Sequence, residues 1–195
     1  MKRTLIVAGL SGMFIPALAS AELNYDAVNV GYSTMRYSNG NQGLTELDVG
    51  FSKSYSKDVY LGASYGTASQ TTYSGLGNKT VRSISLGAGY HTPLRDNVDL
   101  VVAGHIVLGS AKLAGSSTSA NGYDIGAGVR TQFAHGLEGS LAAVHANRSN
   151  GTYTNTDTFL DAQFGFNFTS KIQMNAGIDL LGHDQTTSLG LRFYY

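Results

Sequence analysis

Apolar and polar residues alternate along almost the whole chain after its first twenty or so positions. In the final stretch, 187–195, the residues Leu189, Leu191, Phe193 and Tyr195 fall on one face. A period of two residues predicts β-strands, because successive side chains of a strand point to opposite faces. No later segment shows the helical period of 3.6. The pattern therefore predicts an all-β protein.

The alternation divides the chain into ten expected strands. They are 24–37, 44–55, 58–68, 80–91, 97–112, 122–133, 137–148, 158–168, 172–182 and 187–195. Short turns, such as 92–96 and 169–171, alternate with mostly longer connections rich in Gly, Ser, Thr and Asn, such as 113–121 and 149–157. This arrangement is typical of a transmembrane antiparallel up-and-down β-barrel. An even strand number places both chain termini on the periplasmic side, where the short turns lie.

The first residues have a different character. A basic start, Met1-Lys2-Arg3, precedes a mostly apolar run, and the small residues 19–21 follow it. This order is typical of a secretory signal peptide. We expect residues 1–21 to be cleaved, which leaves residues 22–195 as one barrel domain exported through the periplasm.

Composition limits the classes of function. Without Lys2 and Arg3, the chain carries 11 basic and 13 acidic residues, so its net charge is −2 and no nucleic-acid partner is indicated. Charged residues make up only 13%, about half the share expected in a soluble domain. There is no Cys, so no disulfide stabilises the exported chain.

Three features favour a barrel with its apolar face toward lipid over a soluble barrel with its apolar face inside. Strands that run toward the short turns end in aromatic residues, which would form a ring at the membrane interface. The charges on the apolar face are all basic and lie near strand ends, where long side chains reach the interface. The opposite face carries mostly small residues, which suit a narrow interior. The aromatic ring consists of Tyr55, Tyr90, Phe133, Phe168 and Tyr195, and the basic residues are Arg36, Lys53, Arg82 and Lys112.

The C-terminal stretch Leu189, Leu191, Phe193 and Tyr195 resembles the assembly signal of bacterial outer-membrane proteins, which the barrel-assembly machinery recognises. In architecture the chain resembles small outer-membrane β-barrel proteins of the OmpX/Ail-like and opacity-type group. The resemblance implies a Gram-negative outer-membrane location. That group usually has eight strands, so eight is the alternative to the ten counted here.

The inward face carries eight acidic and three basic residues by this alternation. The pattern leaves two interpretations of the lumen open. The charges form a hydrogen-bonded network that fills a narrow, structural barrel, or they line a narrow pore that favours cations. The acidic residues are Asp26, Glu46, Asp48, Asp99, Asp124, Glu138, Asp161 and Asp179, and the others are Arg130, Arg148, Arg192 and His105.

The outer end of the barrel suggests two further functions. Arg36, Arg82 and Lys112 lie at the outer strand ends on the lipid face, where they could bind lipopolysaccharide phosphates. Surface adhesion is the other alternative, with Tyr73 and Tyr153 near loop tips. We expect a monomer in contact with outer-membrane lipid.

Catalysis is a remote alternative. Outer-membrane barrel hydrolases use histidine with acidic or serine partners, and the candidates here are His145 and the pair His183 and Asp184. Adjacent strand residues such as these two point to opposite faces. His91 and His135 are expected in solvated turns. No metal-ligand cluster or cofactor motif is present in the sequence, so we expect a non-enzymatic protein without cofactor.

Overall fold

The computed structural model describes residues 25–36, 43–71, 78–113, 116–133, 136–150, 154–180 and 184–195. The expected signal peptide and the residues Tyr73, His135, Tyr153 and His183 lie outside this part of the chain. Among the described residues, no helix is long and apolar enough to cross a membrane.

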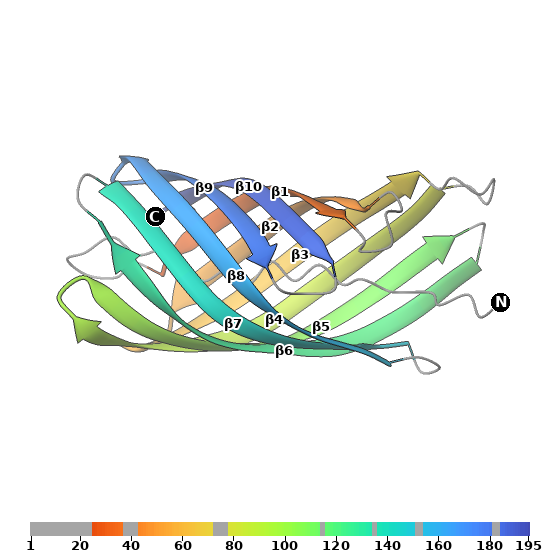
Figure 1. Ribbon diagram of the computed structural model, residues 1–195, viewed down its shortest axis with the longest axis horizontal. Coiled ribbons are helices and arrows are strands. Elements are labelled where there is room, and N and C mark those ends of the chain that lie inside the picture. The colour runs from red at the N-terminus through yellow and green to blue at the C-terminus, as the bar shows by residue number, and fades with distance from the viewer. Residues whose placement is uncertain are drawn as a thin grey trace.

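Ten antiparallel strands form one closed barrel, in which each strand pairs with its neighbours in the chain and β10 pairs with β1 (Figure 1). The predicted fold class and the number of ten strands are therefore confirmed. The strands are β1 (Ala27–Arg36), β2 (Thr45–Ser54), β3 (Val59–Thr71), β4 (Asn78–Arg95), β5 (Val98–Leu113), β6 (Ser116–Gln132), β7 (Leu137–Ser149), β8 (Thr154–Thr169), β9 (Ile172–Leu180) and β10 (Gln185–Tyr194).

Three strands are much longer than the sequence predicted, whereas the other strands differ from their predicted lengths by only a few residues. β6 and β8 begin at Ser116 and Thr154, in segments expected to be loops, and β4 continues to Arg95 through an expected turn. The Ser, Thr and Asn residues of the first two segments indicated loops by composition, but they pair with the neighbouring strands and extend the barrel at the loop end. Because β4 is longer, Tyr90 is not the last outward residue of its strand, and exposed Leu94 follows it.

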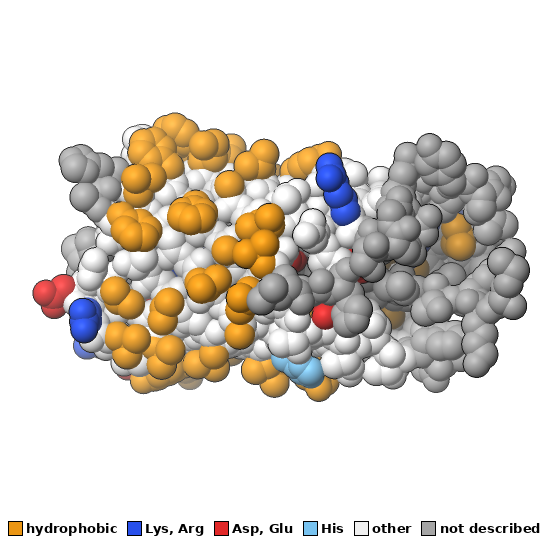
Figure 2. All heavy atoms as spheres, viewed as in Figure 1, with side chains coloured by type: hydrophobic (Ala, Val, Ile, Leu, Met, Phe, Trp, Pro, Cys, Tyr) orange, Lys and Arg blue, Asp and Glu red, His pale blue; other side chains and the backbone are white. Residues whose placement is uncertain are grey.

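The predicted faces agree with the burial pattern. Over most of the strand positions, exposed side chains alternate with buried or half-buried ones, as Val30 and Tyr32 do with Asn29 and Ser33 in β1. Large apolar side chains lie on the outside of the barrel. Figure 2 shows them gathered on the part of the visible face toward the short turns, and the described surface next to this part carries fewer of them.

The seam between the first and last strands is complete. β1 and β10 pair from Ala27 opposite Tyr194 to Arg36 opposite Gln185. At its lower end, the backbone N–H of Tyr195 donates to the carbonyl of Asp26 (3.3 Å). The last strand therefore leaves no open edge, which a barrel in lipid requires because unpaired backbone groups are costly there.

Candidate functional site in the barrel lumen

Buried polar side chains link four neighbouring strands in the lower lumen, near the short turns. Arg130 on β6 forms a buried ion pair with Glu138 on β7. Asn167 on β8 donates a hydrogen bond to the second carboxylate oxygen of Glu138 (3.0 Å), and Gln173 on β9 donates to Asn167 (3.0 Å). These contacts supply hydrogen-bond partners to polar groups that are buried away from water, where a missing partner is costly.

Arg192 on β10 extends this chain to the barrel seam. Its guanidinium donates to the side-chain oxygens of Asn29 on β1 (2.6 Å) and of Gln173 (3.2 Å). Tyr194 also donates from its hydroxyl to Gln173 (3.5 Å). Gln173, Arg192 and Asn29 are at most 2% exposed, so six consecutive strands, from β6 through β10 to β1, are joined by buried contacts.

A stack of rings fills the other side of the lower lumen. Tyr25 lies parallel to Tyr60 with ring centroids 4.5 Å apart, and its ring centroid is 4.3 Å from that of His91. Gly89 is required beside the stack, because a Cβ there would collide with the Tyr60 ring. We call the polar chain and these rings together the lumen floor, which comprises Arg130, Glu138, Asn167, Gln173, Arg192, Asn29, Tyr25, Tyr60 and His91.

A second buried ion pair lies higher in the lumen. Arg148 on β7 binds both carboxylate oxygens of Asp124 on β6, at 2.6 and 2.8 Å. The same guanidinium donates to the carbonyls of Tyr123 and Asn147 (2.9 Å each). His105 is opposite Asp124 in the β5–β6 ladder. A bidentate pair with further backbone contacts fixes the guanidinium in one place.

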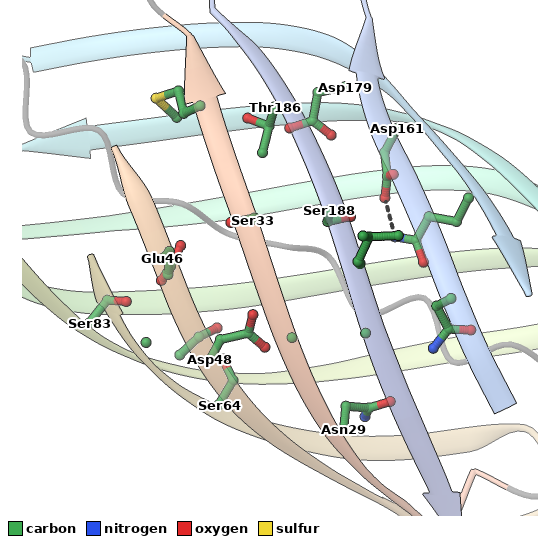
Figure 3. Close-up of a pocket in the computed structure, with 18 of the residues that line it drawn as sticks. Asn29, Ser33, Glu46, Asp48, Ser64, Ser83, Asp161, Asp179, Thr186 and Ser188 are labelled. Atoms are coloured by element: carbon green, nitrogen blue, oxygen red, sulfur yellow. Dashed lines mark hydrogen bonds between the residues drawn. The ribbon is translucent and has the colours of Figure 1, made fainter. Parts of the chain in front are cut away.

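Above the floor the lumen opens into a cavity of about 150 Å³, which we call the upper cavity. Its lining includes Asn29 and Arg192 of the floor and reaches residues near the loop end. Ser33 and Ser188 contribute hydroxyl groups between the acidic residues, and Ser64 lies beside Asp48 (Figure 3). Six carboxylates line the cavity, those of Glu46, Asp48, Asp157, Asp161, Asp179 and Asp184.

The acidic side chains of the upper cavity differ in their contacts. Gln163 donates to Asp161 (2.8 Å), and Thr186 donates to Asp179. Within the described residues, no group donates to Glu46, which is only 6% exposed, and the buried Oδ2 of Asp48 has no hydrogen-bond partner. None of these four carboxylates forms a salt bridge with a described basic residue.

The structure places the predicted inward residues at different heights. The upper cavity holds Glu46, Asp48, Asp161 and Asp179; the middle holds His105 and Asp124; and Arg130 and Arg192 belong to the floor, near which Asp99 is buried. The sequence analysis missed the cavity acids Asp157 and Asp184 and the buried Lys79, because it assigned these positions to connections. It also missed the neutral members of the floor, Asn29, Asn167 and Gln173, which no charge pattern marks.

Two predicted placements are wrong. Asp26 does not face the lumen: it precedes β1 on the outer side and forms an ion pair with the exposed Lys53 (2.6 Å). Although partial burial opposes the effect, hydrogen bonds from Lys53 and Ser54 hold the pKa of Asp26 below its usual value. His91 is not a solvated turn residue, because β4 continues past it and its ring is 3% exposed in the floor.

The remaining predicted residues lie on the outer surface of the barrel. Arg82 and Lys112 are exposed on neighbouring strands, where Arg82 is opposite Ser110 and Lys112 opposite Thr80, so the two are diagonal neighbours. Arg36 is exposed at the end of β1. The five predicted ring aromatics, Tyr55, Tyr90, Phe133, Phe168 and Tyr195, are all exposed on the outside, as are Leu189, Leu191 and Phe193 of β10.

Within the described chain, the candidate catalytic residues lie in different places. His145 is exposed on the outer face, where its ring contacts the hydroxyl of Thr158 (3.0 Å). Asp184 lines the upper cavity, and its proposed partner His183 lies outside the described residues. In the part of the chain described, no three His, Cys, Asp or Glu side chains are placed to hold one metal ion.

Comparison with solved structures identifies the fold. The β-domain of the Bordetella autotransporter BrkA matches with a TM-score of 0.54 and 11% identity, over 87% of this chain and 98% of that one. The NanC porin matches with a TM-score of 0.50 and 9% identity, over 86% and 100%. Neisserial surface protein A matches with a TM-score of 0.44 and 14% identity, over 87% and 95%. No protein-family model and no curated protein matches the sequence. At these identities the chain shares with the first two the fold of outer-membrane β-barrels.

Proposed function

We propose that the protein is an integral outer-membrane β-barrel with a structural role, whose lumen is closed by the floor and does not conduct ions. It acts without catalysis or cofactor. The observation that carries this proposal is the lumen floor, in which buried side chains from both sides of the barrel occupy the lower lumen.

The exposed apolar surface supports the membrane location. Soluble monomers rarely expose apolar patches larger than a few hundred Å². Here apolar side chains are exposed on every strand, among them Leu47 (57%), Ile106 (56%) and Leu189 (60%). Aromatic side chains such as Tyr55 lie near the short turns, as at a membrane interface. In lipid this surface needs no further cover.

Ion conductance in a planar bilayer tests the closed lumen. We expect the refolded wild-type barrel to show no resolved current steps. The double substitution Gln173→Ala and Arg192→Ala removes two large side chains from the floor and is expected to produce steps, provided that circular dichroism shows a folded barrel. Conducting wild-type protein would overturn the proposal. Cation-selective wild-type steps that weaken in Asp161→Asn would instead support the alternative of a narrow cation-preferring pore.

A second candidate function is lipopolysaccharide binding at the outer strand ends. The diagonal arrangement of Arg82 and Lys112 on neighbouring strands favours it, since two cations at this spacing can contact phosphates of one lipid. Arg36 is a third candidate farther around the barrel. Replacing Arg82 and Lys112 by Ala should weaken lipopolysaccharide binding, with Lys57→Ala and Lys171→Ala in the opposite turns as the charge-matched control. Equal binding by both double variants would refute this function.

The last strand has a proposed role in assembly. Leu189, Leu191, Phe193 and Tyr195 present an alternating apolar face that resembles the signal recognised by the barrel-assembly machinery. Their exposure leaves them available before lipid covers them. Replacing Phe193 and Tyr195 by Ser should lower the amount of assembled barrel in outer membranes more than it lowers folding in detergent.

A further inference from the structure

The upper cavity has two pairs of carboxylates on facing walls. Glu46 and Asp48 project from β2, and Asp161 and Asp179 are direct partners in the β8–β9 ladder. Figure 3 shows the two pairs on either side of the cavity, with serine side chains between them. Strands β1, β10 and β9 separate β2 from β8 in the barrel.

Within the described chain, no basic side chain compensates the charges of the first pair, Glu46 and Asp48. Glu46 is only 6% exposed, and no described group donates a hydrogen bond to it. The Oδ2 atom of Asp48 is buried without a partner. A buried carboxylate is costly unless it is paired or hydrogen-bonded. The basic residues that reach the cavity do not supply this pairing, since Arg148 binds Asp124 and Arg192 binds Asn29.

The arrangement does not suit a single metal ion. No three acidic or histidine side chains of the described chain converge on one point. Four strand spacings separate β2 from β8, so the two pairs are on the order of 10 Å apart after allowance for their side chains. Two separated anionic pairs match a ligand with two separated cationic groups.

The surface between the pairs suits a slender, flexible ligand. β1 and β10 present Gly31, Ser33, Ser188 and Gly190 to the cavity. A Cβ at Gly31 would collide with the carboxylate of Asp48, so the glycine leaves room for that carboxylate beside β1. The serine hydroxyls can accept hydrogen bonds from N–H groups along a ligand. The cavity volume of about 150 Å³ limits the ligand to a small molecule.

We propose that the upper cavity binds a linear aliphatic polyamine, with one ammonium group between Glu46 and Asp48 and another at Asp161 and Asp179. The aliphatic segments lie along the small residues of β1 and β10. The ligand enters from the loop end, toward which the cavity lining extends. Binding does not require passage through the floor, so the proposal goes beyond the structural role and does not depend on conductance.

Isothermal titration of the refolded barrel with spermidine, at low ionic strength, tests the site. We expect one spermidine per barrel. Glu46→Gln with Asp48→Asn, and separately Asp161→Asn with Asp179→Asn, should each raise the Kd by roughly tenfold or more, because each removes charge-assisted hydrogen bonds. The matched control is Asp58→Asn with Asp96→Asn, which removes two charges at the turn end and should change the Kd by less than about twofold.

Two further titrations separate the site from general attraction to an acidic protein. Pentylamine, with one ammonium group, should bind at least about tenfold more weakly than spermidine. Mg²⁺ at equal ionic strength should displace little spermidine. The proposal is overturned if wild type shows no saturable binding, if the control loses as much affinity as the cavity variants, or if Mg²⁺ binds more tightly than spermidine. Circular dichroism of every variant establishes that the barrel is folded.

Discussion

The buried ion pair between Arg130 and Glu138 is expected to make Glu138 one of the positions of the floor that are most sensitive to a single substitution. The two side chains are 2% and 1% exposed. Nε and Nη1 of Arg130 have no hydrogen-bond partner within the described chain, so Glu138 is the group that compensates its charge. Glu138→Leu leaves this charge buried and removes the acceptor of Asn167. Breaking a buried pair from one side costs about 3–5 kcal/mol.

The double variant Arg130→Met with Glu138→Leu gives the decisive comparison. It removes both charges, and replacing a buried pair by apolar residues is often close to neutral. We expect it to recover most of the loss and to lie within about 2 kcal/mol of wild type, the remainder being the lost partner of Asn167. Asp26→Asn with Lys53→Gln removes an exposed pair and should have little effect.

Equilibrium urea unfolding in lipid vesicles measures these differences. The chain contains no Trp, so circular dichroism is the suitable signal. The reasoning is refuted if Glu138→Leu lies within about 1 kcal/mol of wild type, or if the double variant is as unstable as the single one.

Three other predictions concern different parts of the barrel. Ile106→Arg places a charge on the exposed apolar face and should destabilise the barrel in lipid by about 2–4 kcal/mol, whereas a small effect in the same urea assay would contradict the lipid-facing orientation. Tyr60→Ala removes a buried ring that stacks on Tyr25 and should cost about 3–5 kcal/mol; an unchanged unfolding midpoint would show that the ring stack does not stabilise the floor. Because the pKa of Asp26 is lowered in the folded state, its pairing with Lys53 stabilises the barrel above the usual aspartate pKa and is lost as the pH falls through the lowered value. The difference in stability between wild type and Asp26→Asn should therefore shrink on acidification, and a constant difference would argue against the pair.

Most of the fold prediction came from the two-residue period of apolar and polar positions. It identified ten strands and the face on which residues such as Val30, Leu108 and Phe164 are exposed, because alternation follows directly from strand geometry. It failed where alternation is weak. The polar segment at the start of β6 has no apolar face to mark it as a strand, and its pairing with β5 depends on backbone hydrogen bonds that composition does not reveal.

The lumen was less predictable than the wall. Charged residues such as Arg130 and Asp161 were assigned to the interior from their parity, but their partners depend on the register between strands. Arg192 contacts Asn29, which is 163 positions away, and no local pattern indicates that contact. His91 was misplaced because Thr92 and Pro93 after it indicated a turn, whereas β4 continues to Arg95.

The seam between β1 and β10 has a consequence for the order of folding. Its ten residue pairs join segments at opposite ends of the described chain, so closure of the barrel depends on contacts of very long sequence separation. Contacts of such long sequence separation make folding slow. Until this seam forms, β1 and the strand at the other side of the sheet each have an unpaired edge, which attracts other strands. A barrel that has not closed is thus prone to aggregation, and its biogenesis requires that the two edges are protected until β10 pairs with β1.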